Sequence, residues 1–237
     1  MARHIVAIPE IPPSGQTLRV VGEEAHHAAR VKRLREGDRV DLRTGRGHIG
    51  HGRVQTIARD KKGEWAFEVC VDSSAEVPEP SPRLVIRSGA PKGDRLEQMI
   101  ESLSQVGVAR WGPLGCALSV VEPREGKLAR LERVAVESMK QCGRAWTLAI
   151  DDARAFETAL GPGVILADAS GGPYTPSGAD TLTLLIGPEG GFTPEEIGQA
   201  RMSGCTIASF GVHTMRVETA AVVAAALVME LERSVRR

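Results

Sequence analysis

The sequence predicts an α/β protein of two domains, and three observations support that prediction. Short runs of β-branched and aromatic residues recur within residues 1–72, residues 73–82 hold three prolines among small and acidic residues, and strands alternate with helices after residue 83. A proline-rich segment of this kind is typical of an extended linker. We therefore expect a first domain over residues 1–72, a linker over residues 73–82 and a second domain over residues 83–237.

The first domain is expected to be a small β-barrel. Three β-rich runs, at residues 39–43, 51–58 and 65–71, are separated by turn-forming residues, as in strands joined by hairpins. One basic helix is predicted over residues 23–34. Gly45, Gly47 and Gly50 satisfy a GxGxxG pattern, but the residues that follow resemble a strand rather than a helix, so a hairpin turn explains them better than a dinucleotide site.

The second domain is expected to contain a mostly parallel sheet covered by helices on both faces. Strands are predicted at residues 84–88, 164–168, 181–187 and 206–210, and helices at residues 93–106 and 127–141 and from about residues 194 and 217. In such sheets, ligands bind beyond the carboxyl ends of the strands. The loops that follow the last three predicted strands are therefore the first places to look for a site.

Composition narrows the classes of function. The net charge is zero, yet residues 26–53 hold eight basic and three acidic residues, whereas residues 151–237 hold six basic and eleven acidic ones. A local basic cluster is a feature of nucleic-acid binding. No apolar run approaches the roughly 20 residues that span a bilayer, and the first residues lack the apolar core of a signal peptide. We expect a cytoplasmic protein with no membrane partner.

Cysteine and histidine spacing argues against a metal or a disulfide framework. The four cysteines lie far apart with no CxxC pair, and no acid or cysteine completes a ligand set with His26, His27, His48 and His51. We expect reduced cysteines and no metal.

Residues 182–197 form the strongest candidate site. An apolar strand leads into Gly187, Gly190 and Gly191, and Thr193 and Glu196 can form a capping box with proline at the first helical position. Such a loop lets a ligand contact backbone amides and carbonyls directly. The alternative is a tight strand-to-helix turn without a ligand.

Residues 206–232 form the second candidate. A strand ends at Gly211, a polar loop carries His213 and Arg216, and a helix that is apolar nearly all round begins at about Val217. That helix must be buried in a core or a subunit interface. Glu218 lies in its first turn, where the helix dipole alone favours an acid, so a capping charge competes with a catalytic role.

Basic residues gather on and around the predicted helix at residues 23–34. Arg30, Lys32, Arg33 and Arg35 lie close together beside two histidines and a basic hairpin. This clustering favours contact with phosphates, and a solvated helix face is the alternative. Aromatic residues are few, so base stacking is restricted to candidates such as Trp65 and Phe192.

These segments, in this order, resemble the RsmE family, whose members methylate N3 of a uridine in small-subunit (16S) ribosomal RNA. The resemblance covers almost the whole chain and rests on Arg3 and on residues 26–34, 92–108, 141–144, 184–192 and 216–220. It implies a PUA-like RNA-binding β-barrel followed by a SPOUT α/β-knot methyltransferase domain, whose trefoil knot holds S-adenosyl-L-methionine (SAM). It also implies a homodimer that acts on ribosomal RNA or the small ribosomal subunit.

The resemblance further implies roles for individual residues. The expected cofactor-binding residues, several of them through their backbone, are Leu166, Leu185, Ile186, Gly187, Gly190, Phe210, Gly211, Met215 and Thr219. The expected RNA-binding residues are Arg3, His27, Arg30, Lys32, Arg33 and Arg144. The expected catalytic residues are Arg216, which would stabilise negative charge on the uracil oxygens, and Glu218. The group that takes the N3 proton stays open among Glu218, Glu189 and Asp168.

The chain departs from the family pattern at four positions. Family members commonly carry arginine at His213, an acid at Lys140, and lysine and glutamate at Ser102 and Gln105. The target nucleotide therefore stays open, as does the choice between free RNA and an assembled subunit as substrate. Two alternative functions stay open as well: a SPOUT methyltransferase for another rRNA or tRNA nucleotide, and a non-catalytic RNA-binding protein of ribosome assembly.

Overall fold

The computed structural model describes residues 4–59, 61, 63–119 and 125–236, and the chain divides into two compact units. Unit 1 consists of Met1–Glu79 and Met139–Thr147, and unit 2 of Pro80–Ser138 and Leu148–Arg237. The short segment Met139–Thr147 was expected within the second domain. It joins unit 1 because its backbone pairs with the turn after β3 (Arg39–Arg43): Thr147 N donates to Gly45 O at 2.9 Å and Gly47 N to Ala145 O at 3.0 Å.

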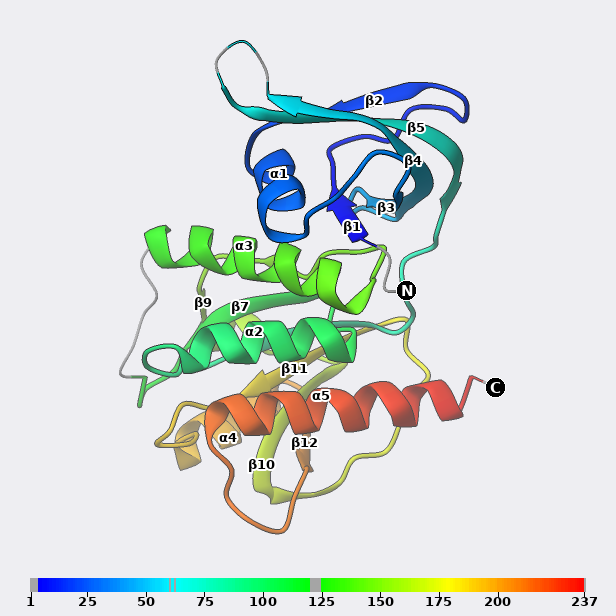
Figure 1. Ribbon diagram of the computed structural model, residues 1–237. Helices are drawn as coiled ribbons and strands as arrows, with labels where there is room; N and C mark the ends of the chain where they lie inside the picture. The colour runs from blue at the N-terminus through cyan, green and yellow to red at the C-terminus, as the bar shows by residue number, and fades with distance from the viewer. Residues whose placement is uncertain (1–3, 60, 62, 120–124, 237) are drawn as a thin grey trace. The chain divides into compact units, whose positions relative to one another are not determined.

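Unit 1 is built on a curled five-stranded sheet (Figure 1). The strand order is β1-β3-β4-β5-β2, with β1 parallel to β3 and the other pairs antiparallel. Alternating residues of these strands, among them Leu42, Phe67 and Val69, are fully buried and form the core of the unit. The strands are β1 (His4–Ala7), β2 (Thr17–Val20), β3, β4 (His48–Arg59) and β5 (Trp65–Glu76).

Strand β5 extends into the segment that was expected to be a linker. Residues 73–76 continue the ladder, with Ser73 opposite His51 and Glu76 opposite His48. The ladder ends just before Pro78, the first of the three prolines, which lack the amide donor that a ladder needs. The unpaired linker is therefore shorter than the predicted residues 73–82.

The predicted basic helix exists, but it is irregular. It consists of α1 (Gly22–His26) followed by one turn of π-helix, His27–Val31, in which Lys32 N donates to His27 O. Arg33 follows with φ = 54°, in the left-handed region that residues other than glycine rarely occupy. A strained non-glycine residue after a π-turn marks this helix end as a candidate functional element.

Unit 2 contains a seven-stranded sheet, and all its strand pairs are parallel, as predicted. The order is β12-β10-β11-β6-β7-β8, with β9 beside β7. The strands are β6 (Arg83–Ser88), β7 (Arg110–Gly115), β8 (Ala149–Ile150), β9 (Arg154–Ala155), β10 (Val164–Pro173), β11 (Thr181–Ile186) and β12 (Thr206–Ser209).

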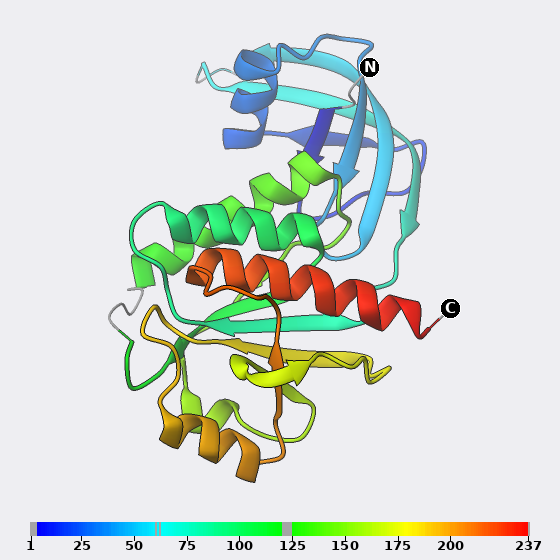
Figure 2. The same ribbon diagram turned by 90° about the horizontal axis from the view of Figure 1, so that it is seen from below.

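Helices cover both faces of this sheet, which confirms the predicted arrangement. Helices α2 (Arg95–Val106) and α5 (Val217–Ser234) pack side by side on one face, and α4 (Pro194–Met202) lies beyond the other (Figure 2). Helix α3 (Glu125–Cys142) begins in unit 2, and its last turn belongs to unit 1. A short 3₁₀ helix spans Phe156–Ala159.

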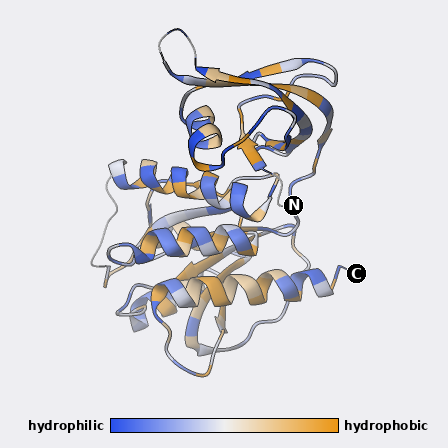
Figure 3. Ribbon diagram, in the orientation of Figure 1, coloured by the Kyte–Doolittle hydropathy of each residue, from blue (hydrophilic) through white to orange (hydrophobic). Residues whose placement is uncertain are grey.

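Helix α5 is apolar along most of its length and polar towards its C-terminal end (Figure 3). One face, including Val217, Ala221 and Val228, is buried in the core of unit 2. A second stripe, Leu227, Leu231 and Val235, is 42%, 36% and 54% exposed. Within the chain, the core therefore covers only part of the apolar surface of the helix.

Among the described residues, no helix is both long enough and apolar enough to cross a membrane.

Candidate active site

The middle of β10 lies beside the carboxyl ends of β11 and β12. Ala167 lies opposite both Ile186 of β11 and Ala208 of β12, and the β10–β12 pairing shifts register after Ala167, so residues 167–169 of β10 lie beside the loops that leave β11 and β12. They enclose a cavity of about 380 Å³, lined by residues 167–169, 186–192 and 209–215 together with Val217, Ala220 and Ala224 of α5. This volume is that of a small-molecule site.

Two glycines of the loop after β11 have close neighbours. A Cβ atom at Gly187 would lie 3.2 Å from the carbonyl carbon of Gly191 and from the ring of Phe192, and one at Gly190 would lie 3.1 Å from the Leu118 side chain. A side chain at either position would push into its neighbours. The loop therefore presents mainly backbone to the cavity.

The capping box predicted for α4 is present and holds this loop. Thr193 Oγ1 accepts from Glu196 N, and Glu196 Oε2 accepts from Thr193 N at 2.9 Å. The other oxygen, Glu196 Oε1, accepts from Ala117 N at 2.9 Å and so fixes the segment that packs against Gly190. Burial, followed by the charge of Glu196, raises the pKa of the nearby Cys116 thiol to about 12, so this cysteine stays protonated and is a poor nucleophile.

Six of the nine expected cofactor-binding residues line the cavity: Ile186, Gly187, Gly190, Phe210, Gly211 and Met215. The other three do not. Leu166 and Leu185 are fully buried in the core, and Thr219 is exposed on α5 outside the cavity. Along a strand, neighbouring side chains point to opposite faces, and it is the next residues, Ala167 and Ile186, that reach the cavity.

One wall was missed by sequence reasoning. Val217, Ala220 and Ala224 of α5 line the cavity, and their spacing of three and four residues places them on one helix face. That spacing was visible in the sequence, but it looked like an ordinary core stripe. The acids Asp168 and Glu189 also line the cavity, against a single basic residue, His213, among the described lining residues.

Arg216 and Glu218 differ in their surroundings. Arg216 is the N-cap residue of α5, its side chain is exposed, and its guanidinium makes no hydrogen bond or ion pair with a described residue. Glu218 is half-buried and pairs with Arg95 at the start of α2, Nη1 to Oε1, at 3.4 Å. Glu218 therefore ties two helices together, whereas Arg216 is available to a ligand.

All the described residues expected to bind RNA belong to unit 1. Arg30, Lys32 and Arg33 are exposed at the irregular helix, and His27 is half-buried in its π-turn. Arg144 is half-buried, and that burial lowers the pKa of its guanidinium. Arg3 lies outside the described residues.

A cavity of about 500 Å³ adjoins this helix within unit 1. Its lining includes His26, Arg30 and Trp65, and Arg59 lies 5.0 Å from the centre of the Trp65 ring. Aromatic and arginine side chains together are typical of surfaces on which bases stack. The other stacking candidate, Phe192, is 8% exposed, lines the cavity of unit 2 and packs against Phe156, with ring centroids 5.5 Å apart, so its role in stacking stays a prediction.

The four departures from the family pattern fall in different settings. Lys140 Nζ pairs with Glu24 Oε1 of α1 at 2.6 Å, and the Lys140 side chain is 7% exposed, so this lysine anchors the basic helix. His213 lines the cavity of unit 2. Ser102 and Gln105 bond within α2, to Gln98 O and Glu101 Oε1.

Two family models match the chain. Residues 78–229 match an RNA methyltransferase domain and residues 22–63 an RNA methyltransferase PUA domain. The expected α/β fold class, with a PUA-like domain ahead of a methyltransferase domain, is confirmed. The trefoil threading of the chain stays a prediction.

Similar proteins carry the name expected from the sequence. The chain is 28% identical to ribosomal RNA small subunit methyltransferase E of Bacillus subtilis over 229 residues, 86% of each chain, and 26% identical to that of Mycobacterium tuberculosis over 241 residues, 94% of this chain and 90% of the other. A probable rRNA-methyltransferase from Porphyromonas gingivalis has a TM-score of 0.83 at 28% identity, covering 98% of this chain and 99% of that one.

A second solved structure shares the fold. Ribosomal RNA small subunit methyltransferase E of Neisseria gonorrhoeae, bound to S-adenosyl methionine, has a TM-score of 0.82 at 22% identity over 97% of this chain and 98% of the other. Because the domain model covers well over half of the sequence, this chain belongs to the RNA methyltransferase family.

Proposed function

We propose that this enzyme transfers the methyl group of SAM to N3 of one uridine in small-subunit ribosomal RNA, in the cytoplasm. The observation that carries the proposal is the cavity between the middle of β10 and the carboxyl ends of β11 and β12 in a chain of the RNA methyltransferase family. The curated relatives are named as small-subunit rRNA methyltransferases, and a protein of the same fold was solved with SAM.

The residues of the cavity fit SAM. Glycines 187, 190, 191 and 211 line the cavity, so a ligand can approach the backbone at these positions, and apolar walls come from Phe210, Val217 and Ala220. Asp168 and Glu189 make the lining acidic, which suits the positive charges of a sulfonium and an ammonium group. When bound, SAM supplies an electrophilic methyl group.

Arg216 is proposed to act on the base that accepts the methyl group. Loss of the proton from uracil N3 leaves negative charge on the ring oxygens, and a guanidinium beside the base stabilises that charge. Arg216 suits this role because it directly follows the loop that lines the cavity and because its guanidinium is uncommitted among the described residues. It would be aligned by the rigid start of α5.

The proton acceptor is proposed to be one of the two acids that line the cavity, Asp168 or Glu189. Asp168 Oδ1 accepts from Ser170 N at 2.8 Å, which orients the carboxylate and leaves its second oxygen for another partner. Glu218 is a weaker candidate because it does not line the cavity and its Oε1 is paired with Arg95.

Unit 1 is proposed to hold the RNA through phosphate contacts. Arg30, Lys32 and Arg33 are exposed cations on one short element, and such contacts fix the position of a nucleic acid without reading its sequence. His27 and Arg144 would contribute from half-buried positions.

The enzyme is also proposed to be a homodimer that pairs through α5. Leu227, Leu231 and Val235 are four residues apart and exposed, so they form one apolar stripe along the helix. The double variant Leu227→Glu, Leu231→Glu should be a monomer by light scattering, whereas Met202→Glu, a charge on the exposed Met202 of α4, should leave the dimer intact. A monomeric wild-type enzyme would contradict the pairing.

The direct test of the function is transfer of labelled methyl groups from SAM to small ribosomal subunits and to naked rRNA, followed by nucleoside analysis. We expect 3-methyluridine at one site in one of these substrates. Label on a different nucleoside would correct the target. Binding of SAM without any labelled RNA would favour the non-catalytic alternative.

A further inference from the structure

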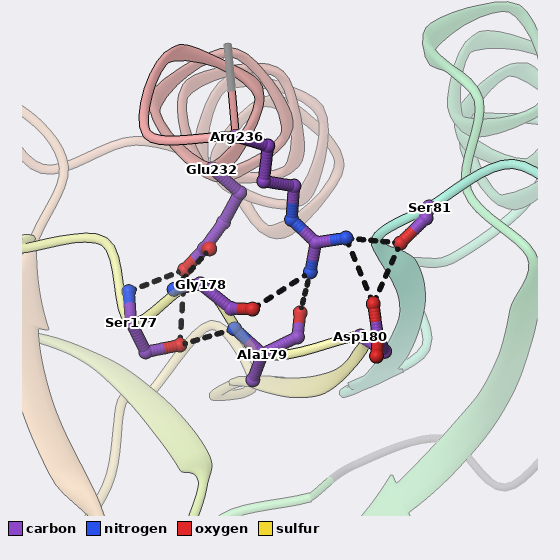
Figure 4. A network of polar contacts seen from close by, with 7 residues as sticks. All are labelled: Ser81, Ser177, Gly178, Ala179, Asp180, Glu232 and Arg236. Carbon is purple, nitrogen blue, oxygen red and sulfur yellow. Dashed lines mark hydrogen bonds and ion pairs between the residues drawn. The ribbon is translucent and has the colours of Figure 1, made fainter.

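A charged side chain is completely buried near the end of α5. Glu232 is 0% exposed, and its carboxylate accepts four hydrogen bonds from the segment between β10 and β11; the bonds from Ser177 and Gly178 can be followed in Figure 4. Oε1 accepts from Tyr174 Oη at 2.5 Å, Ser177 N at 2.8 Å and Ser177 Oγ at 3.1 Å, and Oε2 accepts from Gly178 N at 2.8 Å. A buried carboxylate is tolerated only when its oxygens are satisfied in this way.

One helical turn further on, Arg236 holds the other end of the same segment. Its guanidinium donates to Gly178 O at 3.1 Å and to Ala179 O, and it pairs with Asp180 Oδ1 at 2.9 Å (Figure 4). It also donates to Ser81 Oγ at the entrance to β6. Glu232 and Arg236 thus hold neighbouring parts of one loop, and only Glu232 bonds to Tyr174.

Tyr174 connects this network to the candidate active site. Its ring lies 5.9 Å, centroid to centroid, from the ring of Phe210 at an angle of 34°, the geometry of a favourable aromatic pair. Phe210 lines the cavity. Both rings are partly buried against the core of unit 2, so a shift of Tyr174 frees space behind a wall of the site.

We infer that Tyr174 is a positioning residue for SAM: Glu232 fixes its hydroxyl, and its ring holds Phe210 in the wall of the cavity. The inference rests on the proposed function, since it takes the cavity to be the SAM site. It assigns a role in cofactor affinity to residues that do not line the cavity.

The competing explanation is that the network only stabilises the fold, and substitutions separate the two. Tyr174→Leu removes the ring and the hydroxyl, whereas Tyr174→Phe keeps the ring against Phe210 and removes only the bond to Glu232. Arg236→Met is the matched control, because it breaks contacts of the same loop and leaves the bond between Glu232 and Tyr174 in place.

The test is isothermal titration of each purified full-length protein with SAM, well below its melting temperature, together with separate KM values for SAM and RNA. We expect Tyr174→Leu to weaken SAM binding about tenfold, the effect of losing one aromatic pair, and Tyr174→Phe to weaken it less. The KM for RNA should stay at the wild-type value in both. Arg236→Met should lower the melting temperature without changing the Kd for SAM.

Wild-type SAM affinity in Tyr174→Leu would overturn the inference and leave the proposed function standing. So would an equal loss of affinity in Arg236→Met, because general loosening of the loop would then explain both variants. A wild-type chain that does not bind SAM would overturn the proposed function itself, and the inference with it.

Discussion

The two candidate binding regions present different chemistry to their ligands. In unit 1, exposed long cationic side chains project from a short irregular helix. In unit 2, glycine loops and small apolar side chains surround a cavity, and the backbone forms much of its surface. Ligand affinity at the charged surface should fall when a charge is removed. Ligand affinity at the glycine-lined cavity should fall when a side-chain atom is added. Three predictions use this difference, and a fourth concerns a buried charge outside both surfaces.

The largest effect, on the methylation rate, is expected from Arg216, whose side chain adjoins the cavity of unit 2. Arg216→Ala should lower the methylation rate by about 100- to 1,000-fold, because a preorganised charge beside the reacting base contributes this much. The Kd for SAM, measured by titration, should hardly change, since Arg216 does not line the cavity. Arg201→Ala, which removes an exposed arginine from α4, is the control. Normal turnover in Arg216→Ala would remove Arg216 from its proposed role.

The backbone-lined cavity should be sensitive to a single methyl group. Gly187→Ala places Cβ 3.2 Å from Gly191 and Phe192, so the loop must move, and we expect SAM binding to weaken about tenfold, or about 1.4 kcal/mol. Gly198→Ala adds the same methyl group in α4, where nothing lies within 4 Å. It should raise the melting temperature slightly through helix propensity. Equal SAM affinity in both variants would mean that the loop does not contact the cofactor.

In unit 1, one substitution should lower RNA affinity by removing a charge and raise protein stability by relieving backbone strain. Arg33→Gly removes a cation, and we expect a roughly five- to tenfold loss of RNA affinity in low salt. The same change suits φ = 54°, and we expect it to stabilise the protein by about 0.5–1 kcal/mol. Filter binding and denaturant melts measure the two effects. Arg33→Lys keeps both charge and strain, so it should differ little from wild type. A destabilised Arg33→Gly would show that the arginine is structural.

The smallest effect concerns the buried carboxylate of unit 2. Burial alone would raise the pKa of Glu232, but its hydrogen bonds, first from the Tyr174 hydroxyl and then from Ser177 N and Gly178 N, outweigh it and lower the pKa below the ordinary value of 4.5. Tyr174, whose own pKa is raised by burial and by this carboxylate, is the titratable group that faces it. Nearby Arg236 is engaged with Asp180.

A depressed pKa in the folded state stabilises the protein above the unfolded pKa, and this contribution is lost as the pH falls through the folded value. The stability advantage of wild type over Glu232→Gln should therefore be constant near pH 7 and shrink below about pH 4.5. Urea melts at several pH values measure it. A constant difference down to pH 3 would contradict the assignment.

Local signals predicted the parts of the molecule that depend on neighbouring residues. Apolar runs predict β3, β6 and β11, and the residues from Thr193 to Glu196 predict the capping box. Glycines after an apolar strand predict the cavity loop, because glycine lets a ligand or another segment approach the backbone closely.

The remaining features depend on residues far apart in the chain. Lys140 meets Glu24 across 116 positions and Glu232 meets Tyr174 across 58, and nothing in either local sequence names the partner. Leu166 and Leu185 point into the core, and the residues that follow them, Ala167 and Ile186, line the cavity. The resemblance indicated the three strands that border the cavity, but the predicted end of β10 at residue 168 was wrong, since the strand continues to Pro173. Only register and pleat decide which residue of each strand faces the cavity.

Because of the π-turn at His27–Val31, the place at which the basic helix loses a residue determines which way its cationic side chains point. Such a turn holds one residue more than a turn of α-helix, and each residue of an α-helix rotates the next by about 100°. A deletion of one residue within the π-turn would regularise the helix and leave Lys32 and Arg33 on the same side, whereas the same deletion in the regular turn of α1 would rotate both cations by about 100°. Insertions and deletions, as well as substitutions, can therefore redirect the cations of this helix.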